Sequence, residues 1–213
     1  DEGRINKGAA KILFGKVYLT KGDFQKAKDK LAEVVEHESE YGFGLHKDYH
    51  ANWLRDTEAG IEAVLYIEYK EPPFQHNGEM ALAGPKYSIP GSLGISALNE
   101  ADIPTQELYD QFDNRDLRKK TNFKTEFAHL KTGEILKSSI PLSGKFWVEG
   151  LETGDRCDVN MHIIRYADAI LMYAEALNEV GESTKALAML NRIRERAFGD
   201  DSGNFKPMSK DEF

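Results

Sequence analysis

The sequence predicts a mainly α-helical protein: tetratricopeptide-like helix hairpins with a long loop-rich insertion carrying short strands. Two observations predict this class. Apolar residues recur at helical spacing near both ends of the 213-residue chain, whereas the middle concentrates glycine, proline and short strand-like runs. We therefore expect a helix hairpin at residues 1–40, the insertion at residues 41–154, a second hairpin at residues 155–198 and the start of a further loop at residues 199–213.

The first hairpin is predicted near the start of the chain. Apolar residues follow helical spacing on both sides of Gly22. We expect helices over residues 4–20 and 23–37. The small residues Gly15 and Ala27 stand where the two helices must approach closely, as the tetratricopeptide pattern requires.

The insertion has a different character from the helical ends. It holds both tryptophans and turn signals such as Asn77-Gly78 and Pro90-Gly91. Rigid helices on either side of variable loops are a common setting for a ligand site. We therefore look for the functional residues of this chain in the insertion.

The second hairpin has the clearer pattern. Its apolar residues are three and four positions apart on both sides of Gly181, which can take the left-handed conformation that ends a helix. We expect helices over residues 161–180 and 184–198. We place Leu171 and Leu190 on the stripes that face the core, where truncation to alanine would cost roughly 2–5 kcal/mol.

The two hairpins share a residue pattern. When Gly22 is aligned with Gly181, small and large apolar residues coincide at five positions: Gly15 with Ala174, Tyr18 with Leu177, Ala27 with Ala186, Leu31 with Leu190 and Val34 with Ile193. This agreement favours true repeats of ~34 residues over two unrelated amphipathic hairpins. We expect the two pairs to pack together, since each buries only one stripe alone.

Composition and motifs exclude several functions. The net charge of −8 disfavours a nucleic-acid partner, and the basic cluster at residues 115–120 is interpreted as a solvated surface. No nucleophile elbow, phosphate loop or dinucleotide fingerprint is present. Cys157 is the single cysteine, so no internal disulfide forms and a structural thiol is expected. We expect no catalytic residue, no cofactor and no metal ligand, which favours a binding protein over an enzyme.

Four segments, in the same order as in the family, resemble the SusD/RagB family of surface glycan-binding lipoproteins of Bacteroidetes. They are RINKGAAKILFGKVYL at residues 4–19, EAVLYIEYK at 62–70, PTQELYDQFDNRDLR at 104–118 and IIRYADAILMYAEALNEVG at 163–181, followed by LNRIRERA. The run IRYAD is the most specific of these. The resemblance covers nearly the whole sequence.

The resemblance implies that residues 1–213 are part of a single SusD-like domain. Family members are considerably longer, so we interpret the sequence as an internal segment of a longer protein. The resemblance also implies a non-catalytic protein of the bacterial cell surface. It would be held in the outer membrane by a lipid on an N-terminal cysteine outside this sequence. Its partners would be an oligosaccharide or polysaccharide and a SusC-type TonB-dependent transporter that takes up the glycan.

The resemblance fixes no binding residue, because the site loops differ between family members. A sugar ring needs a flat aromatic platform for its C–H face and polar groups for its hydroxyls. On this chemistry alone we predict a site for neutral oligosaccharide in the insertion, formed by Trp53, Phe74, Gln75, Asn77 and Tyr87. For Trp53 and for Trp147, which is not among the five, the alternative is a place in the core, because tryptophan is mostly buried. For Phe74 and Tyr87, the sequence favours a place in the core and a role in ligand binding about equally.

A second hypothesis from a different class stays open. A helical-repeat adaptor would bind a protein or peptide through its helices or loops, with the middle region as a spacer. An array of repeats should continue in register, whereas here a long insertion separates the two units. This break favours the glycan-binding protein.

Overall fold

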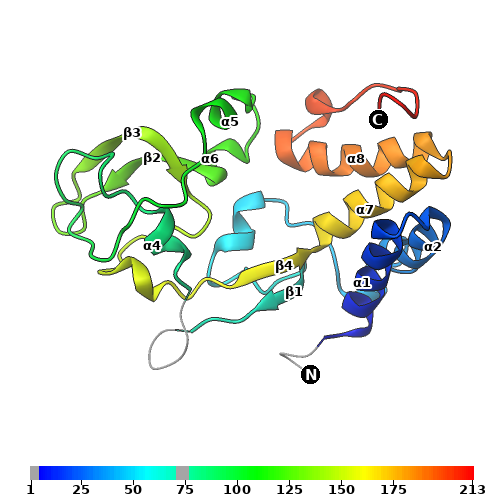
Figure 1. Cartoon of the computed structure of the whole chain (residues 1–213), viewed down its shortest axis with the longest axis horizontal. Helices are drawn as coiled ribbons and strands as arrows, with labels where there is room; N and C mark the ends of the chain where they lie inside the picture. The colour runs from blue at the N-terminus through cyan, green and yellow to red at the C-terminus, as the bar shows by residue number, and fades with distance from the viewer. Residues whose placement is uncertain (1–4, 71–76) are drawn as a thin grey trace. The chain divides into compact units, whose positions relative to one another are not determined.

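The computed structural model describes residues 5–70 and 77–213, and the chain divides into two compact units. We name them the helical unit and the insert unit. The helical unit consists of Asp1–Asp48, Ala59–Ile67 and His162–Phe213, and the insert unit consists of Tyr49–Glu58 and Glu68–Met161. Figure 1 labels the strands and most of the helices of both.

Two helix hairpins build the helical unit: α1 (Lys7–Thr20) with α2 (Phe24–Val35), and α7 (Tyr166–Glu179) with α8 (Ser183–Phe198). Each hairpin turns at a glycine with positive φ, +75° at Gly22 and +85° at Gly181, the left-handed conformation that ends a helix at little cost only for glycine. The unit also contains the short helix α3 (Glu38–Tyr41) and the 3-10 turn η3 (Asp201–Gly203). None of the described helices is long and apolar enough to cross a membrane.

One boundary of the second hairpin was predicted wrongly. Met161–Arg165, expected as the start of a helix, forms strand β4, which pairs with β1 (Ala63–Ile67) in a two-stranded sheet. Two successive isoleucines favour the extended chain here. The helix begins only at Tyr166, because the Asp168 carboxylate accepts the backbone N–H of Arg165 at 2.7 Å and so caps the first turn.

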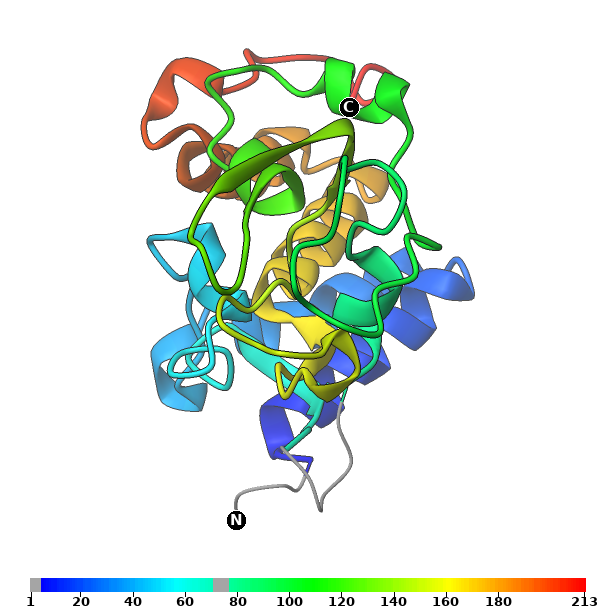
Figure 2. The ribbon, with the colours of Figure 1, turned by 90° about the vertical axis from the view of Figure 1, so that its left-hand side faces the viewer.

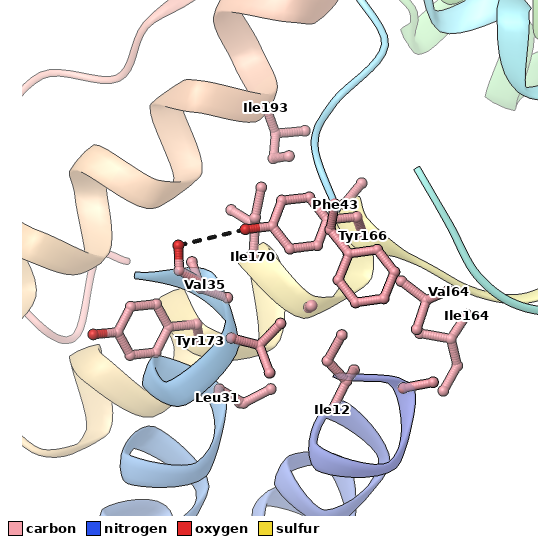
Figure 3. Packing of buried hydrophobic residues seen from close by; sticks show 14 of the residues in the cluster. Ile12, Leu31, Val35, Phe43, Val64, Ile164, Tyr166, Ile170, Tyr173 and Ile193 are labelled. Atoms are coloured by element: carbon pink, nitrogen blue, oxygen red, sulfur yellow. Dashed lines mark hydrogen bonds between the residues drawn. The ribbon is translucent and has the colours of Figure 1, made fainter. Parts of the chain in front are cut away.

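The core of the helical unit lies where the two hairpins pack on each other (Figure 3). Tyr166 and Tyr173 of α7 are almost completely buried against Ile12 of α1 and Leu31 of α2. The Tyr166 hydroxyl donates a hydrogen bond to the backbone oxygen of Val35, over 3.4 Å. The prediction that the hairpins pack together is therefore confirmed.

The predicted stripe on α7 needs one correction. Ile170 and Leu177 are fully buried, but Leu171 is 38% exposed, and Leu190 on α8 is only half-buried. Neighbouring residues of a helix are turned by about 100°. A stripe centred on Ile170 and Leu177 therefore leaves Leu171 at its margin. The close approach of α1 and α2 is as predicted, since a Cβ atom on Gly15 would lie 2.5 Å from Leu31 Cγ.

Short elements joined by long loops make up the insert unit (Figure 2). Strands β2 (Phe123–Ala128) and β3 (Ile135–Ser143) form an antiparallel hairpin with a register shift between Lys124 and Glu126. The remaining elements are η1 (Tyr49–Trp53), α4 (Glu79–Ala83), α5 (Gln106–Gln111), α6 (Lys119–Asn122) and η2 (Gly154–Arg156). Helical hairpins with few short strands are thus the observed fold class.

Cys157 lies in one of two small cores of the insert unit, beside Tyr49, Trp53 and Met80. Burial raises the pKa of its thiol to about 11, so the thiol stays protonated at neutral pH. The protonated sulfur donates a weak hydrogen bond to the backbone oxygen of Phe146. The structural role expected for this cysteine fits these surroundings.

Glu58 makes the stability of the insert unit depend on pH. The side chain is 6% exposed, and its burial raises the pKa of the carboxyl to about 7 against the opposing hydrogen bond from the Asn160 backbone N–H. The ordinary pKa of a glutamate carboxyl is 4.5, so between pH 4.5 and about 7 the native state keeps a proton that the unfolded state has released. Stability is therefore expected to fall as pH rises through this window.

The Glu58→Gln variant keeps an acceptor for the Asn160 N–H but has no ionisable carboxyl at this position. Its stability should therefore not show the fall that Glu58 causes in the wild-type protein as pH rises. We expect it to exceed the wild-type protein in unfolding free energy by roughly 1–3 kcal/mol at pH 8. At pH 4 the two proteins should match, because the wild-type carboxyl is then protonated in the native state. Urea unfolding at a series of pH values measures both. A constant difference across pH 4–8 would contradict the assignment to Glu58.

Candidate functional site

The structure does not bring the predicted site residues together on one surface. Trp53 is 6% exposed and packs its ring on Tyr49, with ring centroids 4.6 Å apart, in the core that also holds Cys157. A face enclosed in this way cannot stack on a sugar. The prediction that Trp53 is a platform is wrong, and the core alternative holds. Trp147 is half-buried and packs edge-on against Phe127.

Asn77 also has a structural role in place of the predicted one. It is 1% exposed, its amide donates to the backbone oxygen of Val159 at 2.9 Å, and its side-chain oxygen accepts the Glu79 N–H at 2.7 Å. These bonds use its polar atoms inside the insert unit, so Asn77 is removed from the candidate site. Phe74 and Gln75 lie outside the described residues.

Tyr87 is placed as a binding aromatic should be. Its side chain is 76% exposed, the highest value among the large apolar side chains of the described residues. The Lys86 ammonium lies 5.2 Å from the centre of the ring. Most of the ring faces solvent, with a hydrogen-bond donor beside it. Of the predicted residues that the structure describes, Tyr87 alone has this exposure.

A compact loop, residues 84–100, presents this ring, and we call it the Tyr87 loop. Its ends meet, because Glu100 donates its backbone N–H to the Gly84 oxygen at 3.0 Å. Beneath the loop, Ile89, Leu93 and Leu98 are buried against Phe127 and Leu142 of the β2–β3 hairpin. Backbone hydrogen bonds Ser139–Ser88 and Leu130–Leu93 attach the loop to the same hairpin. Although it has no regular structure, the loop is therefore fixed on both sides.

Glu100 holds the segment around Tyr87. One carboxylate oxygen accepts the backbone N–H groups of Lys86, Tyr87 and Ser88 at 2.7, 2.7 and 2.9 Å. Partial burial opposes the charge, but these bonds prevail and lower the pKa of the Glu100 carboxyl below its ordinary value. Three convergent donors around one anion fix the backbone on which the aromatic ring stands.

The Tyr87 loop also contains the only two non-glycine residues with positive φ among those described, Ala97 at +58° and Glu100 at +52°. Each such conformation costs of the order of 1–3 kcal/mol and persists only where the surroundings enforce it. Strain of this kind gathers at binding and catalytic sites. Here it accompanies a pocket of ≈ 180 Å³ that the loop encloses, lined by Lys86, Ser92 and Ile95 among others.

The sequence did not indicate Glu100, whose role depends on a turn that brings it under residues 86–88. A polar residue near a Pro-Gly-rich loop is too common to single out. No cluster of His, Cys, Asp and Glu side chains suited to a metal ion occurs within residues 5–70 and 77–213. The arrangement at Tyr87 can therefore be described as an exposed aromatic ring, an adjacent ammonium group and a rigid backbone.

Comparisons with known proteins agree on one family. A sequence model of the SusD family matches residues 140–213. The SusD-like protein P2 of Formosa agariphila is 29% identical over 96% of this chain and 44% of its own length. The chain thus spans about half the length of the curated relatives that it matches.

Solved structures share the fold over the whole chain. A SusD superfamily protein from Parabacteroides distasonis superimposes with a TM-score of 0.82 at 24% identity, covering 99% of this chain and 48% of that one. Surface glycan-binding protein A from Bacteroides thetaiotaomicron, in complex with laminarihexaose, gives a TM-score of 0.75 at 18% identity, with 98% and 50% covered. At these identities the likeness shows the fold.

Proposed function

We propose, from the premise that this chain belongs to the SusD/RagB family, that it binds glycan at the bacterial cell surface without cleaving it. In this proposal the protein is anchored in the outer membrane by a lipid and passes oligosaccharide to a SusC-type TonB-dependent transporter. The helix hairpins act as a tetratricopeptide-like scaffold, and the insert unit carries the ligand site. The observation that carries the proposal is Tyr87, exposed on a loop that is otherwise fixed.

The relatives support the ligand class. Surface glycan-binding proteins from Bacteroides species share the fold, one of them in complex with laminarihexaose, and another relative is described as a laminarin-binding SusD-like protein. We therefore propose the class of ligand, a neutral oligosaccharide, on the chemistry of the Tyr87 loop.

Stacking is the central interaction of the proposed site. The exposed face of Tyr87 would cover the C–H face of a sugar ring, and the Lys86 ammonium would donate to a hydroxyl. Glu100 fixes the backbone of both residues before the ligand arrives. Binding then loses little conformational entropy, which is the advantage of a pre-organised site. No bond is made or broken in this scheme. Phe74 and Gln75 remain proposed contributors from sequence.

Replacing Tyr87 by alanine tests the site. We expect calorimetry of the intact protein with laminarihexaose and a panel of other neutral oligosaccharides to show affinity reduced about tenfold or more, the usual effect of truncating a central aromatic contact. The matched control is Tyr87→Phe, which keeps the ring and should stay within about threefold of wild type. Salt should change the affinity little, because stacking requires no charge.

Two results would count against the proposal. Equal affinity of wild type and Tyr87→Ala for every glycan that binds would remove the site from the Tyr87 loop. Release of reducing sugar during incubation would show chemistry and contradict the non-catalytic role.

The adaptor remains a second candidate because of one observation. Helix α1 keeps Leu13, Phe14 and Val17 exposed, at 41%, 58% and 47%, on the face turned away from its own core. Such a stripe suits contact with another protein. It is compatible with a transporter partner, but an adaptor would use it without any glycan. Absence of binding across a broad glycan panel, together with a protein partner lost on Phe14→Glu, would favour the adaptor.

A further inference from the structure

A second pocket of the insert unit differs in character from the Tyr87 loop. Its volume is ≈ 400 Å³, and it is formed by the segment from α5 to α6 together with strand β2. The lining residues used below are Tyr109, Asn114, Lys119, Lys120, Phe123 and Lys124. The size lies within the usual range for small-ligand sites, about 300–1,000 Å³.

The lysines of this pocket are not neutralised equally. Lys124 pairs with Glu149 at 2.9 Å. The Lys119 ammonium instead donates to two uncharged oxygens, the backbone oxygen of Phe112 at 3.0 Å and the side-chain oxygen of Asn114 at 2.9 Å. Lys120 is exposed, and the structure shows no partner for its ammonium group among the described residues. Two positive charges are thus left without a paired carboxylate.

The acidic residues of the lining are occupied elsewhere. Asp116 is held by the Arg118 guanidinium, with its closest contact at 2.6 Å, and is 6% exposed. Glu126 lies 3.3 Å from the Lys137 ammonium. The pocket therefore concentrates positive charge on a chain whose net charge is −8. Such a local reversal of sign attracts an anion into the pocket.

An aromatic wall accompanies the charge. Tyr109 is half-buried and meets Phe123 edge-on, with ring centroids 5.3 Å apart and planes at 86°. The Lys119 ammonium lies 4.5 Å from the centre of the Tyr109 ring. Apolar ring surface beside ammonium groups suits a ligand with both a C–H face and an anionic group. A free inorganic anion would use only the lysines.

We propose that this pocket binds an acidic sugar residue of a glycan, one that bears a carboxylate or a sulfate group. The Lys119 and Lys120 ammonium groups face the anionic substituent, and Tyr109 contacts the ring. The ligand class rests on the glycan-binding function proposed above, but the pocket shares no residue with the Tyr87 loop. The protein would then bind a polysaccharide at two sites of different chemistry, the Tyr87 loop and the lysine pocket.

The test uses the intact protein and Lys120→Gln, because the Lys120 ammonium forms no hydrogen bond or ion pair with the described residues that the change would remove. Calorimetry with an oligogalacturonate and with a sulfated carrageenan oligosaccharide should show affinity reduced by about five- to tenfold for at least one of them. Wild-type affinity for that ligand should also weaken as salt rises from 0.05 to 0.5 M. The matched control is Lys131→Gln, an exposed lysine of the β2–β3 turn outside the pocket with the same change in net charge.

Equal binding of the acidic oligosaccharides to Lys120→Gln and Lys131→Gln, or no binding of either ligand, overturns the proposal. Inorganic sulfate that competes as well as the sulfated oligosaccharide also overturns it, because the sugar would then contribute nothing. Laminarihexaose and Tyr87→Ala, measured in parallel, separate the two sites. Unchanged neutral binding in Tyr87→Ala would count against the Tyr87 loop alone, and reduced acidic binding in Lys120→Gln would then still support the lysine pocket.

Discussion

Replacing Glu62 by alanine is expected to lower the unfolding free energy by about 3–5 kcal/mol, the cost of breaking a buried ion pair from one side. Glu62 is fully buried in the helical unit. Its carboxylate accepts from Arg165 at 3.1 Å and from Arg196 at 2.8 Å, and the Arg196 side chain is itself 6% exposed. A third bond comes from the His46 backbone N–H at 3.1 Å. The substitution leaves two guanidinium groups without the carboxylate that neutralises them.

Urea unfolding of the intact protein measures this effect. Glu175→Ala is the matched control, since Glu175 is an exposed glutamate on α7 and its loss should stay within about 0.5 kcal/mol. Glu62→Gln should fall between the two, because an amide keeps an acceptor but carries no charge. A loss below about 1 kcal/mol for Glu62→Ala would show that the cluster does not hold the helical unit together.

Local spacing was enough to predict both hairpins, because a helix buries one stripe and its turn requires a glycine such as Gly181. It was not enough at residues 161–165, where two isoleucines fit a helical stripe and a strand equally well. The pairing of this segment with β1 depends on residues about a hundred positions earlier in the chain. The cluster of Glu62, Arg165 and Arg196 was equally out of reach of local sequence, because Arg196 belongs to α8, far along the chain from Glu62. A single segment carries no sign of such distant partners.

In the candidate site, local sequence also failed to predict which aromatic side chain is exposed. Trp53 and Tyr87 both stand in loop-like sequence, and their chemistry is equally suited to a sugar. Only the tertiary structure separates them, since Trp53 is 6% exposed and Tyr87 is 76% exposed. The basic cluster at residues 115–120 was interpreted as a solvated surface. The sequence could not reveal that Arg118 holds Asp116 while Lys120 stays exposed at a pocket.

Leu177→Ala is expected to cost roughly 2–5 kcal/mol, and Leu171→Ala under about 1 kcal/mol. Both leucines lie on α7, and the same substitution changes helix propensity equally at each. The difference therefore reports burial alone. Leu177 is fully buried in the core between the hairpins, where removal of its branched side chain leaves a cavity next to Tyr173, whereas Leu171 is 38% exposed. Urea unfolding of the two variants gives the comparison directly. Equal losses at Leu171 and Leu177 would contradict the orientation of α7, in which Leu177 faces the core and Leu171 lies at its margin.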